Sequence, residues 1–231
     1  MHRTSKTDGT VVAIYTGQGL QNTVETLFHR VLPECRLVNL IDDGMIHEVI
    51  QAGGITKAIS RRLVQYYQIA ADMGADAILN TCSSVGEVVA IGRRLVDVPI
   101  IRIDEPMAEE AVRRFDAIGV LGTVNTTLKP TVRLLRNKAE EAGKTISVVE
   151  GLAEGAYIAL IDGNSEEHDR LLLETANRIA GTVDGIVLAQ ASMSRMQDAL
   201  MSRIGKDVLS SPLLALKETK KTISRNSAGG D

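Results

Sequence analysis

The feature that most constrains the fold is a regular alternation of short apolar runs with longer amphipathic stretches. Apolar runs of strand length occur at 11–15, 36–40, 77–79, 99–103, 117–121, 145–149, 185–188 and 208–209. Helical patterns separate them, near 20–32, 55–73, 85–95, 105–114, 127–142, 165–181 and 192–203. Such alternation predicts an α/β fold in which helices cover parallel sheets.

The strands repeat in the second half of the chain. The segment 12–17 resembles 118–123, and 75–79 resembles 183–187. When the alignment of 75–79 with 183–187 is extended without gaps, Cys82 stands opposite Gln190 and Ser84 opposite Ser192. We therefore expect two pseudosymmetric lobes, each a parallel sheet flanked by helices, with the active site in the cleft between them.

The repeat also predicts where the lobes begin and end. The first lobe is predicted to comprise 10–114 and 205–221, and the second 115–204. The last strand and the helix that follows it are thus expected to return to the first lobe. The two ends, 1–9 and 222–231, are predicted to be flexible tails.

A polar loop at 80–84, Asn-Thr-Cys-Ser-Ser, follows one of these predicted strands and leads into a helix. Ser84 and Glu87 fit a capping box, so Cys82 is predicted to lie just before a helix N-terminus. Free N–H groups and the helix dipole stabilise an anion there, either a carboxylate substrate or the Cys82 thiolate, whose pKa they lower. The alternative is a cysteine that serves as a small apolar core residue.

Composition excludes several other classes of protein. The net charge of −3 argues against a nucleic-acid or membrane-surface binder, and no apolar run approaches the ~18 residues of a membrane span. No signal peptide is evident, and Cys35 and Cys82 form no disulfide framework, so a cytoplasmic protein is expected. The histidines lack metal-ligand spacing, and Gly17-x-Gly19 lacks the rest of a dinucleotide fingerprint.

Three motifs together resemble the aspartate/glutamate/hydantoin racemase superfamily. They are Asn-Thr-Cys-Ser at 80–83, Gly-Val-Leu-Gly-Thr at 119–123 with Thr126 and Thr127, and Val-Leu-Ala-Gln-Ala-Ser-Met at 187–193. The resemblance covers about 10–216. It implies two α/β lobes, an active site between them and chemistry without a cofactor, PLP or metal. In the family, one cysteine from each lobe flanks the carbon beside a carboxylate; one removes its proton and the other returns a proton on the opposite face.

This chain departs from that pattern at one catalytic position. The first family cysteine matches Cys82, but the second is replaced by Gln190. A carboxamide does not titrate, so two-thiol racemisation is not expected. Some relatives keep one cysteine, among them an arylmalonate decarboxylase, and maleate isomerases use cysteine as a nucleophile. The resemblance therefore leaves the reaction open.

The remaining candidates follow the predicted strands. The resemblance assigns the grip on the substrate carboxylate to Thr123, Thr126 and Thr127, although the helix at 127–142 also needs an N-cap threonine before Pro130 in its first turn. Gln190 either donates to a developing enolate oxygen or packs the cleft and bonds the backbone, and Ser192 on the same wall is a further substrate-binding candidate. Asn80, Thr81 and Ser83 around Cys82 are also substrate-binding candidates, although they could instead satisfy the turn and cap. Thr16 and Gln18, at the end of the first strand, are the last two candidates.

Several charged residues have less specific interpretations. Glu150 falls where glutamate racemases carry a glutamate that supports the second cysteine, but a solvated loop carboxylate is expected here. Asp104 and Glu105 are expected to begin the helix at 105–114. His168 is expected on an exposed helix face. Candidates for a second carboxylate site are Arg102, Arg133 and Arg195.

These observations predict a cofactor-independent enzyme, an isomerase or lyase, that performs single-cysteine carbanion or enediolate chemistry on a small carboxylic acid. One alternative is an amino-acid or hydantoin racemase whose second base is Glu150 or a water. Another is a non-catalytic carboxylate-binding protein. A hydrolase with a Cys-His-acid triad is disfavoured, because no histidine follows a strand in the expected position. Dimers or larger assemblies are usual among relatives, so a homo-oligomer is expected.

Overall fold

The structure, a computed structural model, describes residues 9–228 and divides into two compact units. The first is built from the described parts of Met1–Ile103 and Pro212–Asp231, and the second from Asp104–Ser211. Of the predicted tails, 1–8 and 229–231 lie outside the described residues. The prediction is wrong for 222–228, which belong to a helix.

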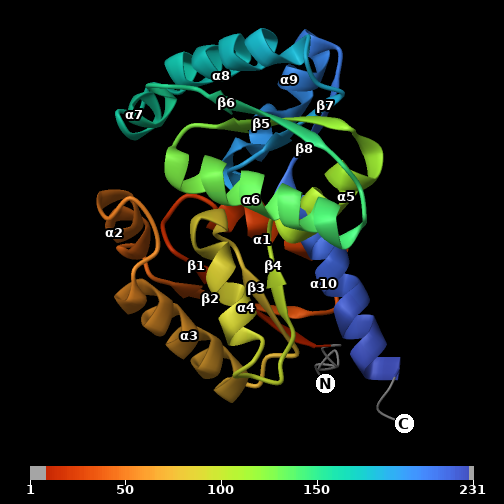
Figure 1. The fold of residues 1–231 in the computed structure, drawn as a ribbon. Helices are drawn as coiled ribbons and strands as arrows, with labels where there is room; N and C mark the ends of the chain where they lie inside the picture. Colours follow the sequence, from red (N-terminus) through yellow and green to blue (C-terminus); the bar gives the residue numbers. More distant parts are fainter. Residues whose placement is uncertain (1–8, 229–231) are drawn as a thin grey trace, which may run out of the picture. The chain divides into compact units, whose positions relative to one another are not determined.

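The first unit contains a four-stranded parallel sheet of order β2-β1-β3-β4 (Figure 1). Its strands are β1 Thr10–Tyr15, β2 Arg36–Ile41, β3 Ala77–Asn80 and β4 Ile100–Arg102. Its helices are α1 Gln21–Val31, α2 Met45–Gln51, α3 Lys57–Asp72, the 3-10 helix η1 Ser83–Val88, α4 Val89–Gly92 and α10 Ser211–Ala228, of which all but Ser211 belongs to this unit.

The second unit contains a parallel sheet of order β6-β5-β7-β8. Its strands are β5 Ala117–Gly122, β6 Ser147–Leu152, β7 Gly185–Leu188 and β8 Asp207–Leu209. Its helices are α5 Glu105–Arg114, α6 Asn125–Glu141, α7 Ala156–Ile161, α8 Ser165–Ala180, the 3-10 helix η2 Ala191–Met196 and α9 Gln197–Ile204. The predicted α/β class with two parallel sheets is confirmed.

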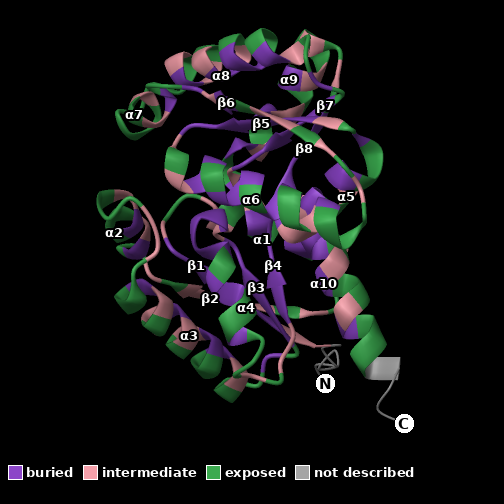
Figure 2. Cartoon of the chain, in the orientation of Figure 1, coloured by how far each residue is buried: buried purple, intermediate pink, exposed green. Residues whose placement is uncertain are grey.

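The central strands of each sheet are buried because helices cover both faces (Figure 2). The covering helices are amphipathic. In α3, Ile59, Leu63, Tyr67 and Ala70 recur on one face and are buried, and Thr56 caps the helix by accepting a hydrogen bond from the Ile59 N–H. Burying a side chain such as Leu63 contributes about 1.5–3 kcal/mol. Within residues 9–228, no helix is both long and apolar enough to cross a membrane.

The two sheets repeat one design. In the first, Ile14 of β1 pairs with Asn80 of β3, and in the second Leu121 of β5 pairs with Leu188 of β7. This register makes Thr16, the first residue after β1, equivalent to Thr123, the first after β5. The comparison of 12–17 with 118–123 is therefore wrong by one residue, because it set Gly17 opposite Thr123.

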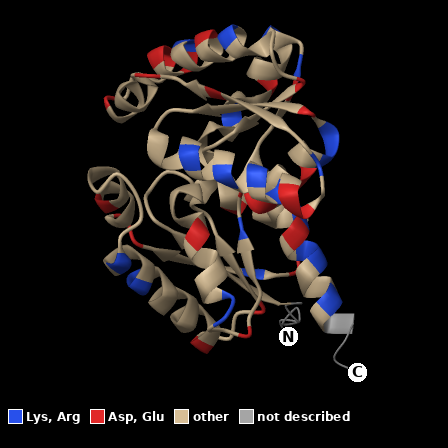
Figure 3. Cartoon of the chain, viewed as in Figure 1, with Lys and Arg blue, Asp and Glu red and all other residues tan. Residues whose placement is uncertain are grey.

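Two predicted boundaries between the units are also wrong. β8 pairs with β7, so it belongs to the second unit, and the chain returns to the first only with Pro212. α5 belongs to the second unit, where the Lys138 ammonium of α6 lies 2.8 Å from Glu105 and 3.0 Å from Glu109. Figure 3 shows the basic positions along α6 and the acidic ones on α5.

Details of several helices differ from prediction. The short helices α2 and α7 were not predicted, and the helices expected at 85–95 and 192–203 each begin as a 3-10 helix. α6 begins at Asn125, after the N-cap residue Val124, so Pro130 lies beyond its first turn. The N-cap threonine predicted for this helix is therefore absent from the structure.

Candidate functional site

Cys82 lies at the carboxyl end of the first sheet, between β3 and η1. It is the N-cap residue of η1, with an extended backbone (φ −116°, ψ 115°) and a half-buried side chain. The Thr16 side chain and the backbone N–H groups of Ser84 and Val85 lie near its sulfur and act as donors that favour its thiolate form. The predicted position of the thiol before a helix is thus confirmed.

The predicted lowering of the Cys82 pKa is wrong. Burial raises the pKa of the thiol, and the nearby donors, Thr16 and the Ser84 and Val85 N–H groups, offset only part of that effect. At neutral pH the group therefore holds its proton. Donors already surround the sulfur, so a thiolate formed during a reaction would be stabilised at once.

The predicted capping box is also absent. The helix begins at Ser83 rather than after Ser84, and its N-cap residue makes no side-chain capping bond. The Ser84 hydroxyl is buried and has no hydrogen-bond partner of ordinary geometry within residues 9–228. It nevertheless lies near enough to Cys82 to help stabilise a thiolate.

Asn80 and Thr81 support the backbone of this loop. Asn80 is fully buried; its Oδ1 accepts a hydrogen bond from the Tyr67 hydroxyl at 3.2 Å, and its Nδ2 donates to the Cys82 carbonyl at 3.1 Å. The Thr81 hydroxyl donates to the Ile14 carbonyl of β1 at 2.8 Å. These bonds fix the position of Cys82. Substrate contacts from Asn80, Thr81 and the buried Ser83 stay predictions.

The loop after β1 brings one of its two candidates to the cysteine. Thr16 is buried and contacts Cys82, whereas Gln18 is exposed and donates to Asp43 at 2.9 Å. Gly17 is required because a Cβ at this position would lie 2.9 Å from the side chain of Ile46 in α2. The close approach of α2 to this loop thus depends on glycine.

Gln190 occupies the equivalent position in the second unit. It is the N-cap residue of η2, with a backbone (φ −120°, ψ 130°) close to that of Cys82. Its Oε1 accepts hydrogen bonds from the Thr123 backbone N–H at 2.8 Å and from the Thr123 hydroxyl at 2.7 Å. The structure thus joins two of the predicted residues, Thr123 and Gln190, in one hydrogen-bonded pair.

The other candidates of the second unit lie in the first turns of two helices. In α6 the Thr127 hydroxyl donates to the Val124 carbonyl at 3.0 Å, while the Thr126 hydroxyl is buried without a partner in the described part of the chain. Ser192 is an exposed residue of η2. Substrate contacts from these three residues stay predictions.

The carboxylates have clear structural roles. Asp104 and Glu105 begin α5, as predicted. Glu150 is exposed, as expected, but it lies within β6 rather than in a loop, and its carboxylate is 2.6 Å from the Lys129 ammonium. Within residues 9–228, no three His, Cys, Asp or Glu side chains gather as a metal site requires.

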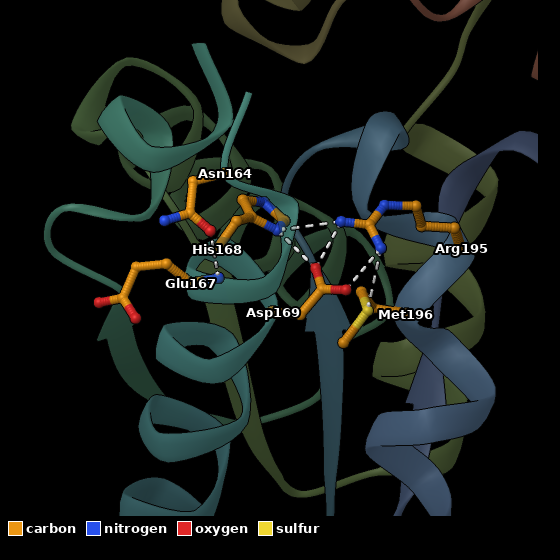
Figure 4. A network of polar contacts seen from close by, with 6 residues as sticks. All are labelled: Asn164, Glu167, His168, Asp169, Arg195 and Met196. Carbon is orange, nitrogen blue, oxygen red and sulfur yellow. Dashed lines mark hydrogen bonds and ion pairs between the residues drawn. The ribbon is translucent and has the colours of Figure 1, made fainter. Parts of the chain in front are cut away.

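The prediction that His168 is exposed is wrong. It is 2% exposed, and its Nδ1 lies 2.8 Å from Asp169 Oδ1. Figure 4 shows this contact as a dashed line. Arg195 of η2 donates to Asp169 Oδ2 at 2.7 Å and also hydrogen-bonds Oδ1, so it links η2 to α8. Burial would raise the pKa of Asp169, but the hydrogen bonds from Arg195 and His168 outweigh this and hold it below its usual range.

Two supporting residues, His168 and Tyr67, were not identified from the sequence, although a sequence signal existed for His168. His168 stands one helical turn before Leu172, and the buried stripe continues through Ala176 and Ile179. This helical periodicity is hard to recognise because the neighbours of His168 (Glu166, Glu167 and Asp169) are all charged. No local pattern identifies Tyr67 as the partner of Asn80, because that bond joins a helix and a strand.

Fold and site together define a class: an α/β protein made of two equivalent units, with a thiol at the N-cap position after β3 and a carboxamide at the matching position after β7. Comparison with known proteins gives the family. A model of the Asp/Glu/hydantoin racemase family matches residues 11–219, and the chain belongs to that family.

Individual relatives agree with this assignment. Glutamate racemase from Streptococcus sanguinis (strain SK36) is 27% identical over 116 residues, a stretch that covers 49% of this chain and 43% of that enzyme. The match thus spans less than half of that relative's length. Among solved structures, an allantoin racemase from Klebsiella pneumoniae aligns with a TM-score of 0.72, 17% identity, and 94% and 89% coverage of the two chains. A glutamate racemase from Bacillus anthracis aligns with a TM-score of 0.73 and 15% identity, and the alignment covers 95% of this chain and 83% of that one. At these identities the structural likeness shows a common fold.

Proposed function

We propose that this protein is a cofactor-independent enzyme, an isomerase or lyase, that acts on a small carboxylic acid through a single cysteine. One observation carries the proposal: the equivalent N-cap positions after β3 and β7 hold a thiol and a carboxamide. Of these two groups only Cys82 can exchange a proton with a substrate carbon, because the Gln190 amide does not titrate.

The environment of Cys82 favours a role as proton donor. Its raised pKa keeps the thiol protonated at neutral pH. In the proposed step the S–H bond breaks as a C–H bond forms at the carbanion or enediolate carbon beside the carboxylate. The thiolate left behind is stabilised by Thr16 and by the Ser84 and Val85 N–H groups. It regains a proton from solvent in a lyase, or from the substrate carbon in an isomerase.

The alternatives differ in where the second proton transfer occurs. A racemase would need another base, and the candidates are Glu150 and a water; Glu150 forms an ion pair with Lys129. A non-catalytic protein would bind the acid without exchanging protons. The expectations of Gln190 as a donor to the substrate, of a cytoplasmic location and of a homo-oligomer stay predictions.

Deuterium exchange tests the proposal. The enzyme is incubated in D2O with a panel of malonic, α-hydroxy and α-amino acids, and label at the α-carbon is followed by NMR. Label without inversion supports one-base chemistry, and label in both enantiomers supports the racemase. Stabilisation by an acid without any exchange supports the non-catalytic binder.

The variant Cys82→Ala should lower exchange about 10²–10⁴-fold, the usual contribution of a positioned acid or base. Ligand affinity should stay within about tenfold, ~1.4 kcal/mol, because the loop is held by Asn80 and Thr81. Cys35→Ala is the matched control, since it removes the other thiol in the described chain and should keep full activity. Unchanged exchange in Cys82→Ala would reject the assignment.

A further inference from the structure

The carboxamide of Gln190 is held by its oxygen. The Thr123 backbone N–H, 2.8 Å away, can only donate, so the atom that it meets must be Oε1 and not Nε2. The Thr123 hydroxyl donates to the same oxygen at 2.7 Å. Both bonds come from one residue, and together they fix the direction in which the amide group points.

The other end of the amide is available. Nε2 has no hydrogen-bond partner within residues 9–228, and it is not among the buried polar atoms left unsatisfied. Its two hydrogens are therefore open to solvent or to a ligand. A group fixed in this way can donate to a ligand but cannot accept from one.

The first unit repeats this arrangement with different chemistry. Thr16, equivalent to Thr123, lies near the sulfur of Cys82, equivalent to Gln190, and favours its thiolate form. In each unit the threonine after the first strand thus lies beside the side chain at the equivalent N-cap position, and in the second unit it fixes that side chain by two hydrogen bonds. In one case this supports a proton donor, and in the other it orients a neutral amide.

We propose that Thr123 is a positioning residue that holds the Gln190 carboxamide by its oxygen and so presents the Nε2 hydrogens to an acceptor oxygen of the substrate. The identity of that substrate as a carboxylic acid rests on the proposed function. A carboxylate, carbonyl or enediolate oxygen can accept a hydrogen bond from Nε2. An ammonium group or an amide N–H is itself a donor and cannot form this bond. The second unit thus selects for oxygen at this contact.

Gln190→Glu gives a readout that a merely structural role would not produce. Thr123 holds one oxygen of the new carboxyl group, and the other oxygen can donate only while it carries a proton. The protonated fraction of a carboxyl group falls about tenfold for each pH unit above its pKa. We therefore expect the exchange rate relative to wild type to rise about tenfold per pH unit as the pH is lowered from 8 towards 5. A ratio that does not change with pH would overturn the proposal.

Substitutions of Thr123 separate its hydroxyl from its backbone. Thr123→Val removes one of the two donors and should lower kcat for exchange about three- to tenfold, the value of one hydrogen bond. Thr123→Ser keeps both donors and should restore the rate. Thr182→Val is the matched control, since its hydroxyl donates to the Ile179 carbonyl at the end of α8. Equal rates for the valine and serine variants of Thr123 would overturn the proposal.

NMR separates failure of this inference from failure of the proposed function. In protein with ¹⁵N-labelled glutamine, the Gln190 side-chain signal is assigned by its loss in Gln190→Leu. Thr123→Val should shift that signal in the free protein, and Thr123→Ser should not. A catalytically inactive wild type with this behaviour would reject the proposed function but retain the orientation of Gln190. A Gln190 signal that ignores Thr123→Val would overturn the orientation itself, whatever the activity.

Discussion

At the scale of single residues, the site depends on which groups surround one sulfur atom. Burial raises the pKa of Cys82, while the Thr16 hydroxyl and the Ser84 and Val85 N–H groups act in the opposite direction. Burial dominates because a thiolate loses most of its hydration there. The resting group is therefore a neutral thiol that can become a stabilised thiolate.

This balance predicts the reactivity of Cys82 towards iodoacetamide, which attacks the thiolate. In a Cys35→Ser background, the alkylation rate should rise with pH through an inflection above the ordinary cysteine pKa of about 8.5. Thr16→Val removes a donor and should move the inflection higher, so alkylation is slower at a given pH. Thr222→Val is the control: it also removes a threonine hydroxyl, one that donates to the Glu218 carbonyl, and should leave the pH of the inflection unchanged. An inflection below pH 8 in the wild type would contradict the raised pKa.

At the scale of elements, the helix that begins beside Gln190 is attached to its neighbour by a charged network. Arg195 of η2 binds Asp169 of α8, next to the buried His168 (Figure 4). η2 is only six residues long, so its own backbone bonds provide little stability. Arg195 therefore contributes to the position of the segment that carries Gln190.

Arg195→Ala should lower the free energy of unfolding by about 1 kcal/mol at pH 7, because solvent screens an arginine that is 46% exposed. The folded-state pKa of Asp169 is depressed, so its contribution is full above the unfolded value of about 3.9 and is lost as the pH falls further. Urea unfolding at pH 7 and pH 3 should thus show a smaller difference between variant and wild type at pH 3. Arg170→Ala is the control, since its partners Glu167 and Glu174 lie on its own helix. An equal effect of both variants would show that the link between η2 and α8 adds nothing.

Prediction from the sequence succeeded where the signal is local and failed where tertiary contacts decide. Central strands such as β7 are continuous apolar runs, and the motif around Cys82 precedes a helix as predicted. The strand β8 has three residues, so its sheet is decided by pairing with β7 and not by its own sequence. The Cys82 pKa was misjudged because burial, which dominates it, is not visible in a motif.

At the scale of the whole molecule, the first unit is completed by a segment from the far end of the chain. α10 buries Ala215, Leu216 and Ile223, and Ile223 lies beside Gly9 at the start of β1. Removing these apolar side chains from water stabilises the folded unit. The stability of the first unit should therefore depend on α10.

Leu216→Ala tests this dependence. The side chain is fully buried, so its loss should lower the free energy of unfolding by about 2–5 kcal/mol through lost burial and the cavity left behind. Lys220→Ala on the exposed face of the same helix should change it by less than about 0.5 kcal/mol. The chain has no tryptophan, so urea unfolding is followed by circular dichroism. If Leu216→Ala unfolds at the same urea concentration as Lys220→Ala, α10 does not stabilise the first unit, because a helix that packs on the sheet cannot lose a buried leucine without cost.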